Sequence, residues 1–445
     1  MRRSWAHFPF SPGRFPFFYG WIVLAASVVG IVASTPGQTN GVGVFTDYLV
    51  EALGVSPLEL ALAYMFGTVI SAFCLPYAGR MIDLWGVRIM VVFSTAGLGF
   101  SMLCIAAMEP MTRAAEAVLD TIPYAHLYAA TLVSTFSFFL IRFFGQGCLT
   151  MVSRVMVGKW FNYRRGLASG VSGIFMTLGF MAGPWLLNII VQHYGWQQTC
   201  ILLAVTIGLV VGLVCWLFYR DNPEECGQVM DGITDPEWLA AQRKRAPEDL
   251  RDFTRREALR TRAFWAFTLA LASQGLVLTA FYFHLTALAV EQGLTRDQIY
   301  VVMLYLPCVS IPVNVFAGYI SDKIDLKWLL YVMMPTQAIG SYAVTEMGNF
   351  AGEMLMIFGY GVSGGLFGTI MTVSMPRFFG RLHLGAISGL NMSVMVLSSA
   401  VGPVSFSSIH YFTGSYREAC FASMVLPLLV WALGFRVRNP QERVA

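Results

Sequence analysis

The chain has 445 residues, of which 56% are hydrophobic and only 12% are charged, and its formal net charge is +4 at pH 7. One water-soluble core cannot bury that much apolar side chain, so this composition excludes an ordinary soluble protein and indicates that a lipid bilayer surrounds most of the chain. The basic residues are divided among short loops rather than gathered on one domain, which argues against a nucleic-acid partner.

A membrane-spanning helix needs about 20 mostly apolar residues, and twelve stretches meet this requirement. They are 19–45, 57–79, 88–108, 126–157, 166–192, 197–219, 263–290, 298–320, 327–347, 353–376, 384–410 and 417–437. The sequence therefore predicts an all-α polytopic membrane protein. Its N-terminal six-helix bundle is 1–219, and its C-terminal six-helix bundle is 263–445. Between them, 220–262 is the only long polar stretch, and we expect a linker on the membrane surface with one amphipathic helix.

Basic residues predict the orientation of the spans. One side of the membrane holds 25 of the 29 lysines and arginines, counting Arg154 at a helix end, if it holds both termini, the linker and the loops 79–88, 158–165, 322–327 and 377–381. Cytoplasmic loops carry such an excess, so both termini are predicted to be cytoplasmic, in the inner membrane. The apolar run from Tyr19 exceeds a signal-peptide core, and we expect a retained first helix.

The first span is interrupted by Thr35–Asn40. Pro36 removes a backbone hydrogen bond and Gly37 loosens the turn, which exposes backbone polar groups to a ligand. Irregular backbone at membrane depth is tolerated only against protein or water. We therefore expect Gln38 and Asn40 to line a cavity, the alternative being a helix end near the outer surface.

The loop between the second and third spans has the pattern G-x-x-x-D-x-x-G-x-R. Its residues are Gly79, Arg80, Asp83, Gly86 and Arg88. Glycines permit a close helix approach and a tight turn, and the aspartate can meet a helix N-terminus or a basic partner. We expect these residues to gate the movement of two helices. The alternative is an ordinary positively charged loop.

Two sequence repeats relate the halves of the chain. Gly166, Gly170, Gly183 and Pro184 recur 219 residues later as Gly385, Gly389, Gly402 and Pro403. The stretch Ala78–Asp83 is echoed by Ala317–Asp322, which adds Gly318 and Asp322 to the gating residues. Related halves of apolar helices are typical of transporters with a cavity at the repeat interface. The two Gly-Pro pairs are predicted to be hinges or packing points.

Polar residues inside spans are candidates for substrate binding. Arg142 lies near the middle of the fourth span, where a charge is costly unless it faces a cavity or a partner. It is expected to contact an anion or gate a proton, or else to bond to neighbouring carbonyls. His284 in the seventh span is either an anion-binding or proton-sensing group or an interhelical hydrogen-bonding residue. Asn314 and Asn391 are the further amide candidates.

The loop motif, with its repeat, resembles the signature of the major facilitator superfamily, and Arg142–Gly147 is similar to that superfamily's fourth-span motif. Within it, the chain resembles the monocarboxylate transporter and oxalate:formate antiporter branch, on Phe18–Val23, Trp160–Gly170 and Arg220–Gly227. The resemblance implies twelve helices in two pseudo-symmetric bundles. It also implies secondary active transport of a small organic anion by rocker-switch alternating access, as proton symport or as anion antiport.

The chain departs from this branch where a carboxylate would be held. The branch commonly has a lysine in the first span, and the closest position here is Asn40. Its eighth span usually carries an arginine, whereas 298–320 holds no charged residue. The antiporters' lysine in the eleventh span is also missing, and Asn391 is among the polar residues there. An exporter of neutral or amphipathic compounds and a membrane receptor without net transport therefore stay open. We expect no enzyme activity, no cofactor, no metal and no catalytic residue. The expected partners are a small molecule and the bilayer, with a monomer as the working oligomeric state.

Overall fold

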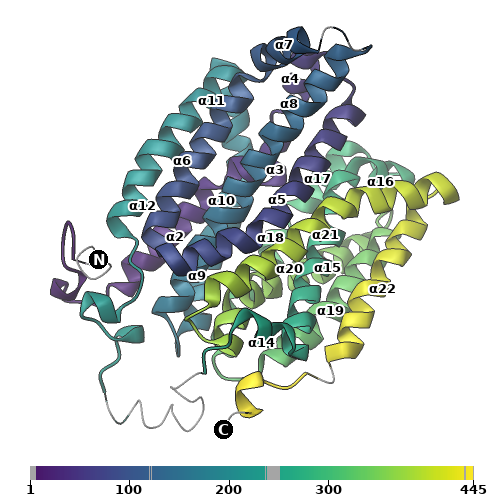
Figure 1. Cartoon of the computed structure of the whole chain (residues 1–445). Coiled ribbons are helices and arrows are strands. Elements are labelled where there is room, and N and C mark those ends of the chain that lie inside the picture. Colours follow the sequence, from purple (N-terminus) through teal and green to yellow (C-terminus); the bar gives the residue numbers. More distant parts are fainter. Residues whose placement is uncertain are drawn as a thin grey trace. The chain divides into compact units, whose positions relative to one another are not determined.

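The computed structural model describes residues 7–119, 121, 123–235, 237, 251–434 and 437–443, and their regular structure is helical, with no strand among them. Figure 1 follows the chain through these helices. The chain divides into two compact units. Unit 1 comprises Met1–Trp160, Leu178–Gln228 and Ser388–Ser393, and unit 2 comprises Phe161–Thr177, Val229–Ile387 and Val394–Ala445.

Unit 1 carries the helices of the first half of the sequence. They are α2 (Gly20–Ala33), η2 (Thr35–Gly37), α3 (Thr39–Gly43), α4 (Thr46–Leu53), α5 (Pro57–Trp85), α6 (Val87–Ala106), α7 (Met108–Val118), α8 (Ala125–Ile141), η3 (Arg142–Leu149), α9 (Thr150–Trp160), the later turns of α10 (Arg165–Tyr194), α11 (Trp196–Val205), η4 (Thr206–Val211) and α12 (Gly212–Phe218). Within the unit, α5 packs against α8, and α6 packs against α11 and α12. A capping box of Ser56 and Glu59 fixes the start of α5, which satisfies N–H groups that the first turn leaves unpaired.

Unit 2 contains the first turns of α10, up to Thr177, and most of the chain from Val229 onward, without Ser388–Ser393. Its helices are α14 (Arg255–Leu259), α15 (Arg262–Phe283), α16 (Leu285–Glu291), α17 (Arg296–Met303), α18 (Leu306–Ser321), α19 (Leu326–Val344), α20 (Phe350–Phe379), α21 (Leu384–Thr413), α22 (Tyr416–Gly434) and η7 (Pro440–Arg443). Within it, α19 packs against α20 and α22, and α18 packs against α20. The core around α15 and α16 is apolar and includes Phe281, Leu285 and Met347, each almost fully buried.

Ten helices of the described chain are long and apolar enough to cross a membrane. The two other predicted spans are not among these ten, and each has a physical reason. The first is interrupted, so that its longest piece, α2, has 14 residues. The ninth corresponds to α19, which has 19 residues and is not among the ten, because Lys327, Gln337 and other polar residues lower its hydropathy. The prediction of an all-α membrane protein is confirmed.

Several of these helices bury only a small part of their apolar surface inside the protein. Only 17% of the most apolar window of α10 and 22% of that of Trp196–Phe218 is buried inside the structure. Large apolar side chains such as Phe73 and Phe316 are more than 60% exposed. In water such a surface would drive aggregation, whereas in a bilayer it faces acyl chains. In the linker, the described residues form only short helices such as α14, and 238–250 lie outside the described residues.

Candidate functional site

The first span is broken where the sequence predicted it. Helix α2 stops at Ala33, the 3-10 turn η2 follows, and Gln38 is extended with φ −83° and ψ 158° before α3 begins. Gln38 donates from Nε2 to Ser34 Oγ at 3.0 Å, and Asn40 donates from Nδ2 to the carbonyl of Phe180 at 2.8 Å. Both predicted amides therefore help to hold the break.

Arg142 binds this break from the fourth span. Its side chain is 2% exposed, and Nη1 donates to the carbonyl of Gly37 at 3.1 Å and to Thr39 Oγ1 at 3.4 Å. Its guanidinium carbon lies 5.3 Å from the ring centroid of Tyr64, whose hydroxyl donates to Thr39 Oγ1 at 3.1 Å. Nε of Arg142 and Oε1 of Gln146 are buried without a hydrogen-bond partner in the described part of the chain. Unused donor capacity thus remains beside the buried turn of Thr35–Gly37.

Local helix geometry places Arg142 at the break. It begins a π-helical segment, η3, and π-helical turns often occur at functional sites because they shift side chains relative to the regular helix. Gly145 of this segment faces Gly37. A Cβ atom added to Gly37 would lie 2.7 Å from Gly145 Cα, and one added to Gly145 would lie 2.8 Å from Gly37 Cα. Two backbones therefore touch directly, and the guanidinium reaches the carbonyl of Gly37.

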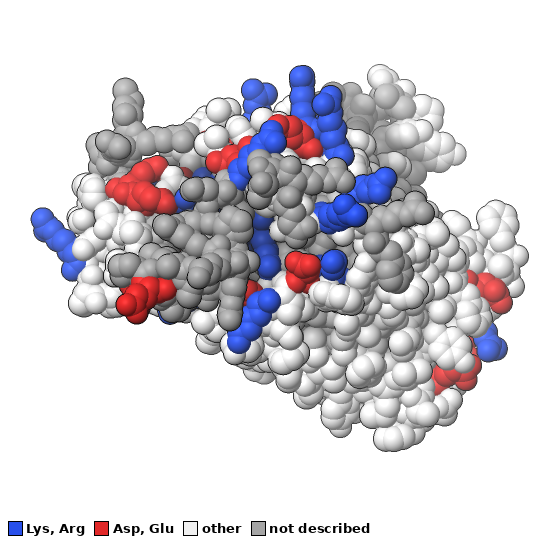
Figure 2. Space-filling view, turned by 90° about the horizontal axis from the view of Figure 1, so that it is seen from below, with Lys and Arg blue, Asp and Glu red and all other residues white. Residues whose placement is uncertain are grey.

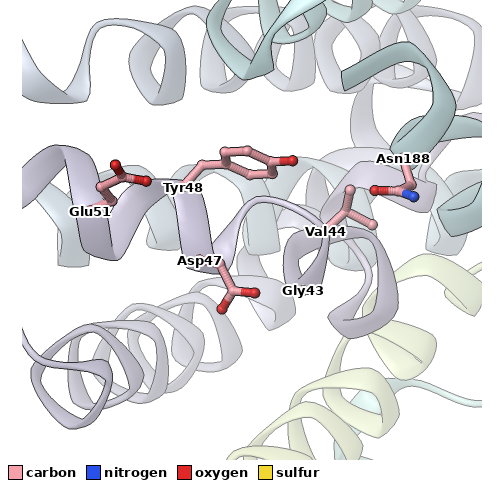
Figure 3. A pocket seen from close by; sticks show the side chains of 6 residues that line it. All are labelled: Gly43, Val44, Asp47, Tyr48, Glu51 and Asn188. Carbon is pink, nitrogen blue, oxygen red and sulfur yellow. The ribbon is translucent and has the colours of Figure 1, made fainter. Parts of the chain in front are cut away.

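A separate pocket of about 430 Å³ lies in unit 1, lined by Gly43, Val44, Asp47, Tyr48, Glu51 and Asn188. Figure 3 shows Asp47, Tyr48 and Glu51 projecting in different directions from α4. The lining contains two carboxylates and no basic residue, which suits a cation or neutral group better than an anion. None of the predicted substrate-binding residues lines this pocket.

His284 and Asn314 lie in unit 2 and are both buried. Nε2 of His284 is 3.0 Å from the carbonyl of Pro403 and 3.2 Å from Ser407 Oγ, so the ring is bonded beside the predicted hinge. Asn314 donates from Nδ2 to the carbonyl of Gly365 at 2.9 Å. Oδ1 of Asn314 and Oδ1 of Asn391, which belongs to unit 1, have no hydrogen-bond partner within the described residues.

Sequence reasoning missed a buried amide network in unit 2. Gln274 donates from Nε2 to Ser363 Oγ at 3.3 Å, and Gln337 donates from Nε2 to Ser273 Oγ at 3.1 Å. Oε1 of each glutamine is buried without a hydrogen-bond partner among the described residues. Glutamine inside an apolar span is itself a signal, because its burial is costly unless it is bonded.

The first loop motif is tied to neighbouring backbone. Gly86 has φ +88°, and Val87 N donates to Asp221 Oδ1 at 2.6 Å. Arg88 is 6% exposed and donates from Nε to the carbonyl of Trp216 and from Nη2 to that of Phe8, each at 2.8 Å. Gly79 meets Gly389, because a Cβ atom on Gly389 would lie 3.0 Å from Gly79 Cα. Arg80 is exposed. Arg88 therefore joins the segment before the first span to the end of the sixth.

The second motif caps the fifth span. Asp322 accepts from Gly166 N at 2.7 Å and from Leu167 N at 3.1 Å. A Cβ atom on Gly318 would lie 2.4 Å from the carbonyl oxygen of Gly166, so only glycine fits this contact without a shift. Burial of the Asp322 carboxyl raises its pKa from 3.8 to about 6, and the two N–H donors and Arg165 oppose this rise.

The predicted hinges are also contact points. A Cβ atom on Gly183 would lie 2.6 Å from Thr35 Cγ2, beside the break of the first span, and one on Gly402 would lie 2.3 Å from the carbonyl oxygen of Leu276. Pro184 and Pro403 lie inside α10 and α21. Among the described residues, no group of three His, Cys, Asp or Glu side chains is placed to hold a metal ion.

The comparisons with known proteins agree with one another on a family. A model described as Major Facilitator Superfamily matches residues 26–403. The chain is 23% identical over 425 residues to MFS-type transporter 1 of Ophiocordyceps sp. (strain BCC 1869), covering 92% of this chain and 83% of that protein. It is 22% identical over 420 residues to monocarboxylate transporter 11 of Homo sapiens (91% and 80%). It is also 22% identical over 263 residues to the oxalate:formate antiporter of Oxalobacter formigenes (58% and 54%).

Solved structures agree on the fold. The proton:xylose symporter XylE, bound to 6-bromo-6-deoxy-D-glucose, superposes with a TM-score of 0.70 at 11% identity, over 96% of this chain and 98% of that chain. The human organic anion transporter MFSD10 superposes with a TM-score of 0.60 at 16% identity, over 93% and 99%. At such identities the likeness shows the fold alone.

Proposed function

Because this chain belongs to the Major Facilitator Superfamily, a family of membrane transporters, we propose that it is a secondary active transporter of a small organic anion, with monocarboxylates as the first class. Transport proceeds by rocker-switch alternating access and is driven by proton symport or by anion exchange. The working parts are the bundles 1–219 and 263–445, joined by 220–262.

The observation that supports an anion is the state of Arg142. Its guanidinium is buried beside the broken first span, and Nε has no hydrogen-bond partner in the described residues. Burying a guanidinium costs free energy, and an incoming carboxylate would offset this cost by accepting hydrogen bonds from the N–H groups that are still unbonded. The names of two relatives, monocarboxylate transporter 11 and the oxalate:formate antiporter, support the same substrate class.

The charge pattern supports a location in the inner membrane, with both termini on the cytoplasmic side. In Figure 2 many lysine and arginine side chains, with some acidic ones, gather over one part of the face seen from below, while much of the rest of that view is uncharged. An excess of basic residues on one side is the usual mark of the cytoplasmic surface.

A second candidate is export of neutral or amphipathic compounds. It is favoured by the two bonds that Arg142 Nη1 already makes, to Gly37 and Thr39, and by the uncharged amides at the other predicted positions. In this alternative Arg142 is a structural clamp on the first span. The pocket lined by Asp47 and Glu51 repels anions and fits this alternative better.

Uptake by proteoliposomes separates the two. Purified protein is reconstituted, and uptake of radiolabelled small carboxylates is measured with and without an inward proton gradient. The Arg142→Ala variant is compared with Arg113→Ala, which removes an exposed arginine that forms an ion pair with Glu109. Uptake that Arg142→Ala abolishes and Arg113→Ala preserves supports the anion proposal. Uptake of neutral compounds alone, at equal thermal stability of both variants, overturns it.

A further inference from the structure

The turns that lead into the fifth and eleventh spans are equivalent. Helix α10 begins at Arg165 and α21 begins at Leu384, and these positions differ by the same 219 residues as the sequence repeat. The preceding residues, 161–164 and 380–383, have the same succession of bend and turn. Ala168 N donates to the carbonyl of Arg164, and the equivalent Ile387 N donates to that of His383. The two turns therefore present the same backbone N–H groups.

Asp231, near the start of the linker, occupies the first turn. Its carboxylate accepts from three successive N–H groups, those of Asn162 at 3.1 Å to each oxygen, Tyr163 at 2.9 Å and Arg164 at 3.1 Å. Asp231 is 3% exposed and has φ 58°, a left-handed conformation that aspartate tolerates better than most residues. A buried carboxylate held by three amides is a specific anchor.

Asp252, near the end of the linker, occupies the second turn. Its Oδ1 accepts from Arg381 N at 2.7 Å and Leu382 N at 3.0 Å. These two residues lie 219 positions after Asn162 and Tyr163, which Asp231 binds. Gly380 has φ +78°, and a Cβ atom on it would lie 2.3 Å from Asp252 Oδ1, so glycine makes room for the carboxylate. Phe253 N also donates to the carbonyl of Phe379 at 3.0 Å.

The two aspartates do not correspond to each other in the repeat. Asp231 follows the sixth span, whereas Asp252 precedes the seventh, yet both cap the same backbone positions. Duplication of the sequence alone therefore does not explain why an aspartate caps each of the two turns. The same anchoring has arisen at both ends of one linker, which points to a shared mechanical need.

We propose that Asp231 and Asp252 are positioning residues for the transport cycle. They fix the turns before α10 and α21, so that each helix bends at its Gly-Pro pair. This role rests on the proposed transport function. Charge-assisted bonds to backbone N–H groups are about twice as strong as neutral ones, so a capped turn resists deformation. In α10 the weak point is then Gly183–Pro184, and in α21 it is Gly402–Pro403.

Hydrogen–deuterium exchange of the full-length protein in lipid nanodiscs tests this without any substrate. The variants are Asp231→Asn and Asp252→Asn, which keep the side-chain size, and the control is Glu237→Gln, an exposed linker residue. We expect Asp231→Asn to speed exchange of the amides of 162–164 by about tenfold. We also expect it to slow exchange near Gly183, because deformation moves from the hinge to the turn.

Asp252→Asn is expected to act likewise on 381–382 and near Gly402, with a smaller effect because Asp252 is exposed whereas Asp231 is buried. Each variant leaves the other turn unchanged, and Glu237→Gln changes neither. Unchanged exchange at the variant's own turn overturns the anchoring. Faster exchange confined to the turn, with the hinge unaffected, overturns the mechanical role and leaves a local cap.

Transport supplies the second readout. With a substrate from the uptake panel, both variants should lower the maximal rate severalfold and leave KM within about twofold, because neither residue contacts the substrate. A raised KM at an unchanged maximal rate contradicts the positioning role. If the panel contains no substrate, the proposed function fails while the exchange experiment still decides the mechanical inference.

Discussion

Replacing Asp322 by asparagine should make the protein more stable at neutral pH. Asparagine resembles the neutral acid in size and polarity and cannot ionise. Burial raises the pKa of Asp322 from its ordinary value of 3.8 to about 6, which means that the folded protein holds this proton more tightly than the unfolded chain. The group therefore contributes its full stability below pH 3.8, and that contribution is lost as the pH rises through about 6.

The size of the effect follows from the shift. About two pK units correspond to about 3 kcal/mol between pH 4 and pH 8, at 1.36 kcal/mol per unit, and the partial exposure of the side chain reduces this to about 2 kcal/mol. The wild-type protein and Asp322→Asn should thus have similar stability near pH 4 and diverge above pH 6. The wild-type protein should be the less stable of the two at pH 8.

Thermal unfolding in detergent, followed by tryptophan fluorescence between pH 4 and pH 8, measures this difference. The matched control is Asp325→Asn, which removes an exposed carboxylate 3.4 Å from Lys327 and should show no such divergence. The reasoning is refuted if Asp322→Asn is the less stable protein at pH 8. In that case the N–H groups of Gly166 and Leu167 favour the carboxylate by more than burial disfavours it.

Two further predictions concern the repeated loop motif. Gly318→Ala should destabilise the protein by about 1–3 kcal/mol, because the new methyl group would lie 2.4 Å from the carbonyl oxygen of Gly166. Gly364→Ala, where a Cβ atom meets nothing within 4 Å, should be neutral or stabilising in the same unfolding assay, and equal effects would contradict the steric argument. Asp83→Asn should impair turnover while the protein still reaches the membrane, and normal uptake by proteoliposomes of this variant would remove Asp83 from the gate.

Local chemistry made the break of the first span predictable. Pro36 cannot donate to the helix ladder, and Gly37 next to it weakens the turn, so the interruption follows from two adjacent residues. The position of Arg142 beside it was not predictable. The guanidinium reaches the carbonyl of Gly37 only because η3 is π-helical and Gly145 lets the two backbones touch, and neither feature has a sequence period.

Long-range caps also escaped sequence reasoning. The pattern of the first loop motif suggested residues that gate two helices, and it did not indicate that Arg88 bonds to the carbonyls of Trp216 and Phe8, which lie far away in the chain. The partners of Asp231 and Asp252 are backbone N–H groups, which every residue except proline offers, so no side-chain pattern marks them. The repeat indicated which turns are equivalent, whereas only the structure shows what binds them.

The anchored ends of the linker have a consequence for how such a chain can grow. Asp231 is bonded to the turn at 162–164, which precedes it in the sequence, and Asp252 is bonded to the turn at 381–382, which follows it. Residues inserted between the two aspartates would therefore lengthen the chain between two points that are already fixed. Doubling a loop's length costs only about 0.6 kcal/mol of closure entropy. This stretch is thus a permissive place for evolution, or for an engineer, to add a whole soluble domain.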